Sequence, residues 1–356
     1  MDEWRVNFFV GRIIKKLLFV FFLLTASGVI SQPASIDFTA IDSTVKTVHF
    51  SSPDTLAQNL TATYTTESEK VRSIFKWITE NIAYDTKGYY NLNKIYNGLF
   101  QPHRFPDSAT VYKNYHDNIV KKVLKEKVAI CDGYTRLFKT LCEIADIKAE
   151  IVIGYVRWYS DTIGEPTKRI HAWNAVEIDK QWYLLDPTWA SGYSNTAVTN
   201  FKKEYDEYYF LTPADQLIND HFPLEDKWSL LSNPITLKQF YNQPYIFSAF
   251  RKYKIRSFKP AAGLIVSKVG GKISFELETD EHENEIDVVA SLKPVAVEST
   301  PGNSSIINIG NLLKPRYTLS GNKVAYVYDI KSRQTKELNV IYNGELAMRY
   351  RVSIEE

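Results

Sequence analysis

The chain of 356 residues carries 43 Lys and Arg against 41 Asp and Glu, which gives a formal net charge of +2. A charge so close to zero gives no reason to expect nucleic acid or an acidic membrane surface as a partner. The length is enough for two domains that each bury a hydrophobic core, at roughly 100–200 residues per domain.

The amino terminus has the order of a secretory signal peptide. Arg12, Lys15 and Lys16 precede an apolar run over residues 17–30, and small residues lie near its end. The run of about 14 residues is shorter than the roughly 20 that a helix needs to cross a bilayer. We therefore predict that residues 1–31 are a cleaved signal peptide, that the protein is exported to the periplasm or the extracellular space, and that the mature chain has no stable membrane insertion.

Between the signal peptide and residue 145 the sequence predicts mainly helices. Thr66 and Glu69 form the pattern of a capping box, and apolar residues at helical spacing follow, so a helix begins after Thr66. Residues 86–106 are rich in Tyr, Asn, Gly and Pro and predict a long loop of the kind that forms a functional rim. The other predicted elements are an N-terminal extension over 32–65 with a short helix at 54–60, a helix at 107–125 and a helix at 131–145.

The pattern then changes to β-strands. Asp179 and Lys180 form the predicted turn of a hairpin, and with a two-residue turn the residues on either side of it pair directly. In that register His171 lies opposite Thr188, and Asp186 is the diagonal neighbour of His171 on the same face. A loop longer or shorter by one residue would put the two side chains on opposite faces. The predicted strands are at 150–158, 171–178 and 181–186.

A thiol, an imidazole and a carboxylate stand at the ends of these predicted elements. Cys131 opens a helix, where backbone N–H groups and the positive end of the helix dipole stabilise a thiolate. Asp132 opposes this by its like charge, so an imidazolium beside the thiolate is needed, and His171 is the candidate. Asp186 would orient His171. These three residues are a candidate nucleophile, base and orienting carboxylate.

Each of the three residues also has a purely structural interpretation. Cys131 is also explained as a small buried residue at the start of a helix, and Asp186 as a cap of the turn that follows it. His171 is also explained as a core histidine beside Trp173. The three contexts together, in one chain, favour the catalytic interpretation.

The other cysteine and the other histidines predict no further site. Cys142 lies eleven residues after Cys131, about 16 Å along a helix at 1.5 Å per residue, which is too far for a disulfide. Its apolar neighbours predict a core position. The remaining histidines lack the spacing of metal ligands and are His49, His103, His116, His221 and His282. We therefore predict no metal and no cofactor.

From residue 257 to residue 356, short alternating segments separated by turn residues replace the helices. This pattern predicts a sandwich-like β-domain of about 100 residues. The predicted strands are at 264–268, 272–277, 285–292, 323–330, 336–342 and 346–354.

Three segments resemble the transglutaminase-like superfamily, in which a Cys opens a helix, a His begins a strand and an Asp precedes a turn. They are Ile130-Cys131-Asp132-Gly133-Tyr134, His171-Ala172-Trp173-Asn174 and Asp186-Pro187-Thr188-Trp189. Ala129 stands where the family often has Gly, a minor departure. Further along the chain, residues 209–213, 221–223 and 228–231 are similar to the segment that follows the core in the kyphoscoliosis peptidase branch of that superfamily.

The resemblance covers roughly residues 66–245 and implies a papain- or transglutaminase-like α+β core. We expect this core over 66–250, followed by the β-sandwich-like domain at 257–356. The resemblance implies Cys131 as nucleophile, His171 as base and acid, and Asp186 as the orienting residue. The backbone N–H of Cys131 is one natural oxyanion donor, and a second donor is expected from residues 86–118.

These residues lead to two hypotheses for function. The first is a secreted cysteine acyl-transfer enzyme with a protein or peptide substrate, which hydrolyses a peptide or isopeptide amide rather than cross-linking, because water surrounds an exposed site. The second is a catalytically silent module that binds a peptide or a glycan, since the family also contains members that have lost the chemistry. Nothing in the sequence sets an oligomeric state.

Overall fold

The computed structural model describes residues 37–89, 109–158, 163–167, 169–195, 197–280, 286–291 and 317–356. The predicted signal peptide at 1–31 and most of the predicted loop at 86–106 lie outside these residues and stay predictions. Within the described ranges no helix combines the length and the apolar character that crossing a membrane requires.

Two capping boxes start helices in the N-terminal part of the fold. Ser52 and Thr55 exchange hydrogen bonds at the start of α2 (Pro53–Thr61), and Thr66 and Glu69 do so at the start of α3 (Glu67–Asn81). The second box confirms the predicted helix start at Thr66. The other helices of this part are α1 (Thr39–Thr44), the 3-10 turn η1 (Val45–Thr47), α5 (Ala109–Glu126) and α6 (Cys131–Ile144).

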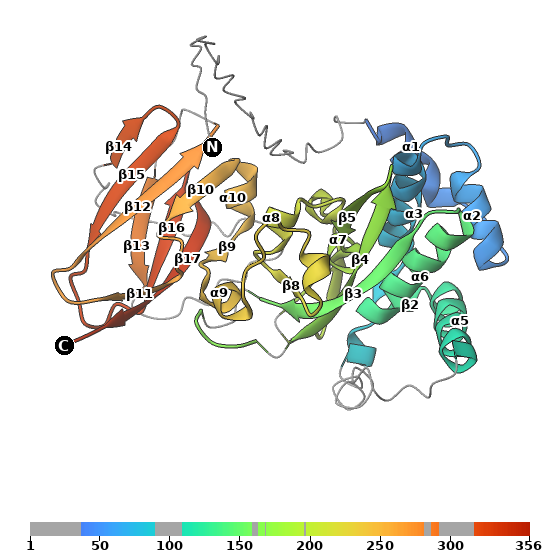
Figure 1. The fold of residues 1–356 in the computed structure, drawn as a ribbon, viewed down its shortest axis with the longest axis horizontal. Helices are drawn as coiled ribbons and strands as arrows, with labels where there is room; N and C mark the ends of the chain where they lie inside the picture. The colour runs from blue at the N-terminus through green and yellow to red at the C-terminus, as the bar shows by residue number, and fades with distance from the viewer. Residues whose placement is uncertain are drawn as a thin grey trace, which may run out of the picture. The chain divides into compact units, whose positions relative to one another are not determined.

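Helix α6 is the central helix of this part (Figure 1). It contacts the helices α2, α3 and α5 as well as the strands β3 (Ala149–Val156) and β4 (Ile170–Ile178). Contacts on so many sides explain why Tyr134, Phe138 and Cys142 are fully buried. Cys142 is a free thiol in the hydrophobic core, as the sequence predicts.

Four antiparallel strands form the sheet against which α6 packs, in the order β5-β4-β3-β8. Asp179 and Lys180 have φ angles of 51° and 66°, the left-handed conformation of a two-residue hairpin turn, and Ile178 pairs with Gln181. The predicted turn and the pairing of the residues on either side of it are therefore confirmed. The outer strands of this sheet are β5 (Gln181–Leu185) and β8 (His221–Pro223).

The predicted pairing of His171 with Thr188 is wrong, because strand β5 ends at Leu185. Asp186 instead caps the short helix α7 (Pro187–Ala190), with Pro187 at its first position. The Asp186 side chain still reaches His171, but it does so from a helix cap. The sequence analysis also predicts no strand at β8, which lies at the edge of the sheet beside β3.

Gly154 allows the strands around it to approach closely. It pairs with His171 of β4 on one side and with Pro223 of β8 on the other. A Cβ atom at this position would lie 2.1 Å from the carbonyl oxygen of Phe222 and 2.4 Å from Cη2 of Trp173. A glycine is therefore needed for β8 to pack where it does, on the opposite side of β3 from the strand that carries His171.

Two β-sheets enclose a second hydrophobic core in the C-terminal part. One has the order β10-β12-β15-β14, and the other has the order β11-β17-β16-β13 with β9 also paired to β17. All six predicted strands are present, and two further strands, β10 and β14, were not predicted. The bounds are β10 (Ile255–Lys259), β11 (Leu264–Ser267), β12 (Lys272–Thr279), β13 (Ile286–Ser291), β14 (Tyr317–Ser320), β15 (Lys323–Asp329), β16 (Glu337–Tyr342) and β17 (Glu345–Ile354).

The remaining described elements are short. Strand β1 (Ala83–Tyr84) pairs in parallel with β2 (Val128–Ala129) directly before Cys131. The others are β6 (Gly192–Ser194), β7 (Phe201–Lys203), η2 (Glu207–Tyr209), α8 (Ala214–Leu217), η3 (Asp226–Ser229), α9 (Leu237–Asn242), β9 (Tyr245–Ile246) and α10 (Ser248–Lys252). Residues 37–356 form one compact unit, and the predicted domain boundary between 250 and 257 stays a prediction.

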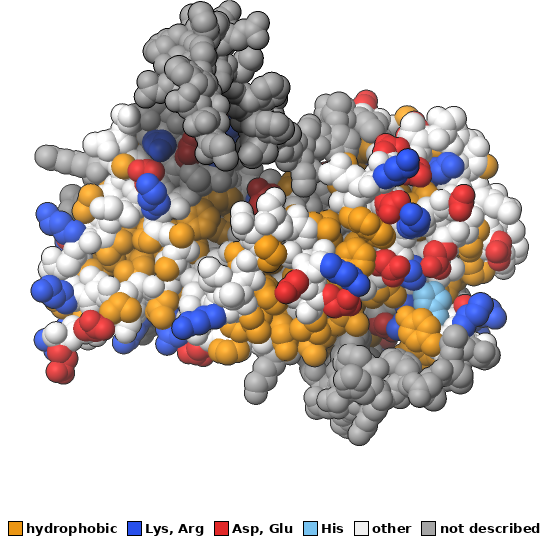
Figure 2. Space-filling view, viewed as in Figure 1, with side chains coloured by type: hydrophobic (Ala, Val, Ile, Leu, Met, Phe, Trp, Pro, Cys, Tyr) orange, Lys and Arg blue, Asp and Glu red, His pale blue; other side chains and the backbone are white. Residues whose placement is uncertain are grey.

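Charged side chains of both signs are interspersed on the face that Figure 2 shows. This distribution agrees with the near balance of 43 basic and 41 acidic residues. A face of mixed charge creates little long-range field of one sign.

Candidate active site

Cys131 is the first residue of α6, and its side chain is almost covered. The residue before it, Ile130, is extended and offers no side-chain cap, so Cys131 lies at the positive end of the helix dipole. Cys131 is 5% exposed and forms no disulfide bond. The predicted position at the start of a helix is confirmed.

The negative charge of Asp132, which counts against a thiolate at Cys131, is paired within the same helix. Oδ1 of Asp132 accepts a hydrogen bond of 2.9 Å from Nε of Arg136. Arg136 is itself buried against α5, where its guanidinium lies over the rings of Tyr112 and Tyr115. The arginine therefore offsets the like charge beside the candidate nucleophile.

His171 lies between Cys131 and Asp186 in the hydrogen-bond network. It is 7% exposed on β4, and its Nε2 lies 2.7 Å from Oδ2 of Asp186. The Cys131 side chain also hydrogen-bonds His171. Because Asp186 occupies Nε2, Nδ1 is the ring nitrogen left to face the sulfur. The structure thus brings together the three residues that the sequence singles out, and their catalytic roles stay predictions.

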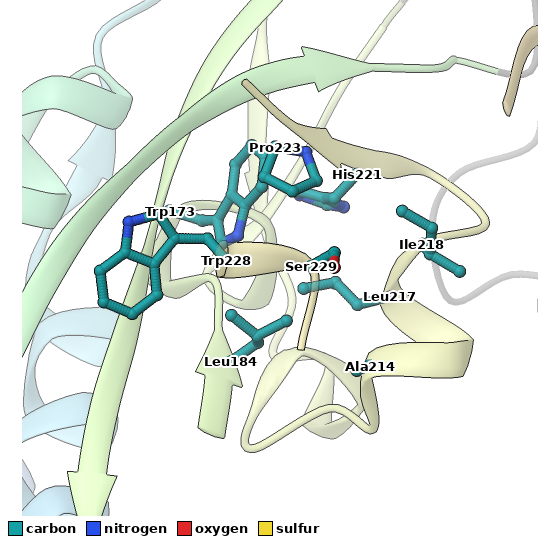
Figure 3. A pocket seen from close by; sticks show the side chains of 9 residues that line it. All are labelled: Trp173, Leu184, Ala214, Leu217, Ile218, His221, Pro223, Trp228 and Ser229. Atoms are coloured by element: carbon teal, nitrogen blue, oxygen red, sulfur yellow. The ribbon is translucent and has the colours of Figure 1, made fainter. Parts of the chain in front are cut away.

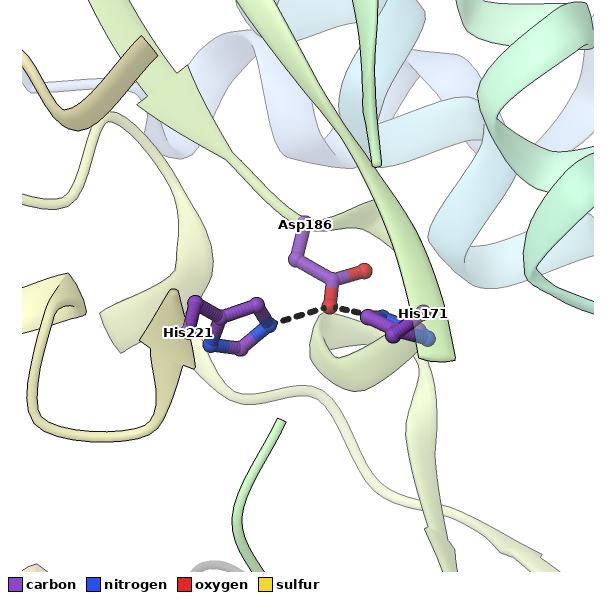
Figure 4. Close-up of side chains that lie close together, drawn as sticks. All are labelled: His171, Asp186 and His221. Carbon is purple, nitrogen blue, oxygen red and sulfur yellow. Dashed lines mark hydrogen bonds and ion pairs between the residues drawn. The ribbon is translucent and has the colours of Figure 1, made fainter. Parts of the chain in front are cut away.

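Asp186 accepts four hydrogen bonds although it is fully buried, at 0% exposure. Oδ1 accepts from the backbone N–H groups of Thr188 at 2.7 Å and Trp189 at 3.1 Å, which makes Asp186 the cap of α7. Oδ2 accepts from His171 and, at 3.1 Å, from Nε2 of His221 (Figure 4). One oxygen of Asp186 therefore caps the turn, as the structural interpretation predicts. The other contacts His171, as the catalytic interpretation predicts.

His221 is the member of the site that the sequence analysis misses. It is 1% exposed on β8, and its Nδ1 lies 2.5 Å from Oδ1 of the preceding residue, Asp220. The sequence gives His221 no metal-ligand spacing and no catalytic role, and this contact and the one to Asp186 place it in the hydrogen-bond network of the site. It lies 35 residues from Asp186 in the chain, so no spacing rule connects them. The signals in the sequence are the adjacent pair Asp220 and His221 and the resemblance of residues 221–223 to the kyphoscoliosis peptidase branch.

Other residues of the segments that resemble the transglutaminase-like superfamily position the elements around the site. A Cβ at Gly133 would lie 2.8 Å from both Cβ of Ala129 and Cγ2 of Val123, so a glycine is needed where α5 crosses α6. The Tyr134 hydroxyl donates to the carbonyl of Ile82 at 2.7 Å and joins the end of α3 to α6. Trp173 stacks on His171 with ring centroids 6.3 Å apart. These residues position the helix and the strand that carry Cys131 and His171.

The electrostatics of the site favour charged His171 and charged Asp186. Burial by itself lowers the pKa of His171, but the charges of Asp186 and Cys131, with their hydrogen bonds, raise it to about 10. Burial by itself raises the pKa of Asp186, but His171 and His221 hold it well below its ordinary range. Burial also raises the pKa of the Cys142 thiol well above its ordinary value, which sets that cysteine apart as unreactive.

Tyr84 lies on the strand that pairs with the residues leading to Cys131. It lies on β1, and burial followed by the charge of Cys131 raises the pKa of Tyr84 well above its ordinary value. The phenol therefore keeps its proton and can donate a hydrogen bond. It lies just before the residues 86–118 from which the second oxyanion donor is predicted.

His171, Asp186 and His221 also offer one potential metal-binding atom each, all within 4.8 Å of one another. The Nε2 to Oδ2 distances of 2.7 and 3.1 Å are those of direct N–H to oxygen hydrogen bonds. We therefore interpret the group as a hydrogen-bonded network between two imidazoles and one carboxylate.

A shallow, partly open hollow lies behind His221 and is lined mainly by apolar side chains (Figure 3). It is too narrow to admit a water molecule. Cys131 is not among its walls, so the pocket is part of the packing around His221 and does not serve as a substrate cleft. Its walls are Trp173, Leu184, Ala214, Leu217, Ile218, His221, Pro223, Trp228 and Ser229.

Residues 54–187 match the model of the Transglutaminase-like superfamily, a range that includes Cys131, His171 and Asp186. Kyphoscoliosis peptidase of Homo sapiens is 32% identical over 228 residues, which are 64% of this chain and 31% of that protein. Hillarin of Drosophila melanogaster is 27% identical over 224 residues, which are 59% of this chain and 25% of that protein. The chain therefore spans about a third or less of the length of these relatives.

A crystal structure of a protein from Cytophaga hutchinsonii is 18% identical and covers 38% of this chain and 36% of that chain, with a TM-score of 0.25.

Proposed function

We propose, from the premise that this chain carries a transglutaminase-like domain similar to that of the kyphoscoliosis peptidases, that it is a cysteine enzyme of amide acyl transfer. The observation that carries the proposal is the hydrogen-bonded series Cys131, His171 and Asp186 at the start of a helix. A thiol, a base in contact with it and a carboxylate on the other ring nitrogen are what nucleophilic catalysis at an amide requires.

The reaction follows from these contacts. Cys131 gives its proton to His171, and the sulfur attacks the carbonyl carbon of the amide to form a tetrahedral intermediate. His171 then gives the proton to the leaving amine as the C–N bond breaks, and a thioester remains. His171 next takes a proton from water, which attacks the thioester and releases the acid and the thiol. An amine in place of water would form a new amide.

Two donors are proposed for the negative oxygen of the tetrahedral intermediate. The first is the backbone N–H of Cys131, at the positive end of the α6 dipole. The second is the hydroxyl of Tyr84, which keeps its proton because burial raises its pKa and whose strand pairs with the residues that lead to Cys131.

The substrate that we propose is a protein or peptide, and the outcome that we propose is hydrolysis of a peptide or isopeptide amide. Water reaches a thioester without a dedicated site, whereas cross-linking needs an amine acceptor that is specifically bound. Export of the mature protein is part of the same proposal, and it rests on the basic, apolar and small residues of 1–31.

A second candidate function is a catalytically silent module that binds a peptide or glycan. The observation in its favour is that Cys131 and His171 are only 5% and 7% exposed, so a substrate amide has little open access to the sulfur among the described residues. The two candidates differ in whether Cys131 of the folded protein reacts.

Alkylation with iodoacetamide separates the two candidates, because the chain has two cysteines in contrasting environments. We expect the native protein to take up one equivalent rapidly at Cys131, whereas Cys142 should react only after unfolding, since its thiol is fully buried. Peptide mapping by mass spectrometry locates the label, and Cys142→Ala is the matched control that leaves only Cys131. Alkylation of Cys131 only in denaturant would contradict the enzyme proposal. A peptide library, assayed with and without added amine, then decides between hydrolysis and cross-linking.

We expect kcat/KM for hydrolysis to fall only at alkaline pH, well above the ordinary pKa of histidine. His171 must be protonated to give a proton to the leaving amine, and its pKa is raised to about 10. A raised pKa keeps the imidazolium present above the ordinary value of about 6.5, so kcat/KM should fall only as the pH rises toward the raised value. A profile of kcat/KM on an amide substrate checks this. A loss of activity centred near pH 6.5 would show that Asp186 and Cys131 do not hold the proton on His171.

A further inference from the structure

His221 has a carboxylate on each of its two ring nitrogens, a feature that the reaction steps above do not use. Nδ1 lies 2.5 Å from Oδ1 of Asp220, and Nε2 lies 3.1 Å from Oδ2 of Asp186. An ionised carboxylate only accepts hydrogen bonds, and a neutral imidazole carries one N–H group. Both contacts are therefore satisfied together only when both nitrogens are protonated, which makes His221 an imidazolium.

The surroundings of His221 fit a fixed charge. The side chains behind the ring are mostly apolar, and the two carboxylates in contact with the ring balance the imidazolium. The Tyr209 hydroxyl donates to Oδ2 of Asp220 at 3.4 Å, on the oxygen that His221 does not use. Burial by itself lowers the pKa of His221, but the charge of Asp220 and the hydrogen bonds to both carboxylates raise it above its ordinary value.

The titratable and charged groups that face His171, His221 and their carboxylates come from several elements. They are Cys131 of α6, Asp186 before α7, Tyr209 of η2, Asp220 before β8 and Arg251 of α10.

We propose that His221 is a positioning residue for acyl transfer: as an imidazolium it holds Asp186 in place and shares the charge of the carboxylate that faces His171. This inference rests on the proposed function, because it concerns how His171 passes a proton to the substrate. Asp186 accepts from both imidazoles through the same oxygen, Oδ2. With His221 charged, that oxygen attracts the proton of His171 less strongly, and His171 releases it more readily to the leaving amine.

The separation of the two rings sets the size of the effect. Their centroids lie 5.6 Å apart. At an effective dielectric constant of about 20, a unit positive charge at this distance changes the proton affinity of a neighbour by about two pH units. Without the charge of His221, the alkaline limb of kcat/KM should therefore move upward by about two pH units.

The protonation state of His221 is directly measurable by NMR on the full chain labelled with 15N-histidine. In the wild-type protein we expect both ring nitrogens of His221 to show imidazolium shifts from about pH 5 to pH 9, beyond the ordinary histidine range. Asp220→Asn removes one counter-charge and keeps the side-chain size, so His221 should then titrate within that interval. Asp215→Asn, an exposed carboxylate on α8, is the matched control and should leave the His221 signals unchanged.

The role in the reaction is tested by His221→Gln, whose amide can still donate to Asp186 but carries no charge. We expect the alkaline limb of kcat/KM to shift upward by about two pH units and kcat to fall about tenfold, if half of that change appears in the barrier. KM should stay near the wild-type value, because His221 does not face the substrate. His49→Gln replaces an exposed histidine outside the site and should change neither quantity.

The two readouts keep this inference separate from the proposed function. A wild-type His221 with only one protonated ring nitrogen near pH 7 overturns the inference even if the enzyme is active. An alkaline limb that His221→Gln leaves unmoved does so as well, and if that variant does not fold, the Asp220→Asn profile answers the same question. An inert Cys131 in the native wild-type protein contradicts the proposed function, whatever the state of His221.

Discussion

Cys131→Ser is expected to lower acyl-transfer activity by at least about a thousandfold and to leave the fold intact. The change is nearly isosteric, but a serine hydroxyl does not form the anion that a thiol forms beside an imidazolium. Steady-state rates on a verified peptide substrate measure the loss, and thermal melts within a few degrees of the wild type show that structure is retained. Cys142→Ala removes the other thiol and should keep the activity. Equal activity of Cys131→Ser and the wild type would rule out Cys131 as the nucleophile.

Asp186→Asn is the comparison that separates a proton carrier from an orienting group. It should lower the rate less than the loss of Cys131 or His171 does, because the imidazole remains and only its orientation and tautomer are disturbed. Asparagine also places an NH₂ group where Asp186 has an acceptor for two imidazoles or for two backbone N–H groups.

The same carboxylate contributes to stability in a pH-dependent way. Its pKa is lowered in the folded state by His171 and His221, so the stabilisation is present above the ordinary value of about 3.9. It is lost as the pH falls from that value through the lowered pKa. The Asn variant should lack this part of the acid dependence.

Gly154→Ala is expected to lower both stability and activity, because the added methyl group has no room. It would meet the backbone of Phe222 and the ring of Trp173, and overpacking of this kind costs about 1–3 kcal/mol. Relief requires β8 to move away from β3, which separates His221 from Asp186. Thermal melts, kcat/KM and the His221 NMR signals measure the three consequences.

Gly270→Ala is the matched control for this substitution. Its φ of 81° also disfavours a side chain, but nothing lies within 4 Å of the added Cβ. It should therefore lower the melting temperature and leave kcat/KM unchanged. An unchanged melting temperature and rate for Gly154→Ala would show that β8 does not need the close approach at this position.

Helix starts and short turns were predictable because their causes act over a few residues. The capping box at Thr66 and the left-handed turn at Asp179 and Lys180 are local hydrogen-bonding and backbone preferences. The start of α6 at Cys131 follows in the same way, as do the six C-terminal strands with their alternating pattern. Strand β14 has all four residues exposed and therefore lacks the alternation that marks a half-buried strand.

The three segments that resemble the transglutaminase-like superfamily also predicted that Cys131, His171 and Asp186 lie together. The way in which Asp186 reaches His171 was not predictable, because β5 ends one residue earlier than its pattern indicates. Asp186 then caps α7, and the hydrogen bonds of that cap point one oxygen away from the imidazole and leave the other for it. Asp186 could end strand β5 or cap helix α7, and the packing of the folded chain decides which of the two it does.

The types, order and local spacing of the residues thus predict the helices, the hairpin and the position of a thiol at a helix start, because each depends on neighbours along the chain. They also show the resemblance to the transglutaminase-like superfamily. His221 belongs to the site only through tertiary structure. It reaches Asp186 because β8 pairs at the sheet edge beside Gly154, where the lack of a side chain permits the approach. Contacts between strands that are distant in sequence depend on packing that no local pattern encodes, so the charge that His221 adds beside Asp186 is visible only in the folded chain.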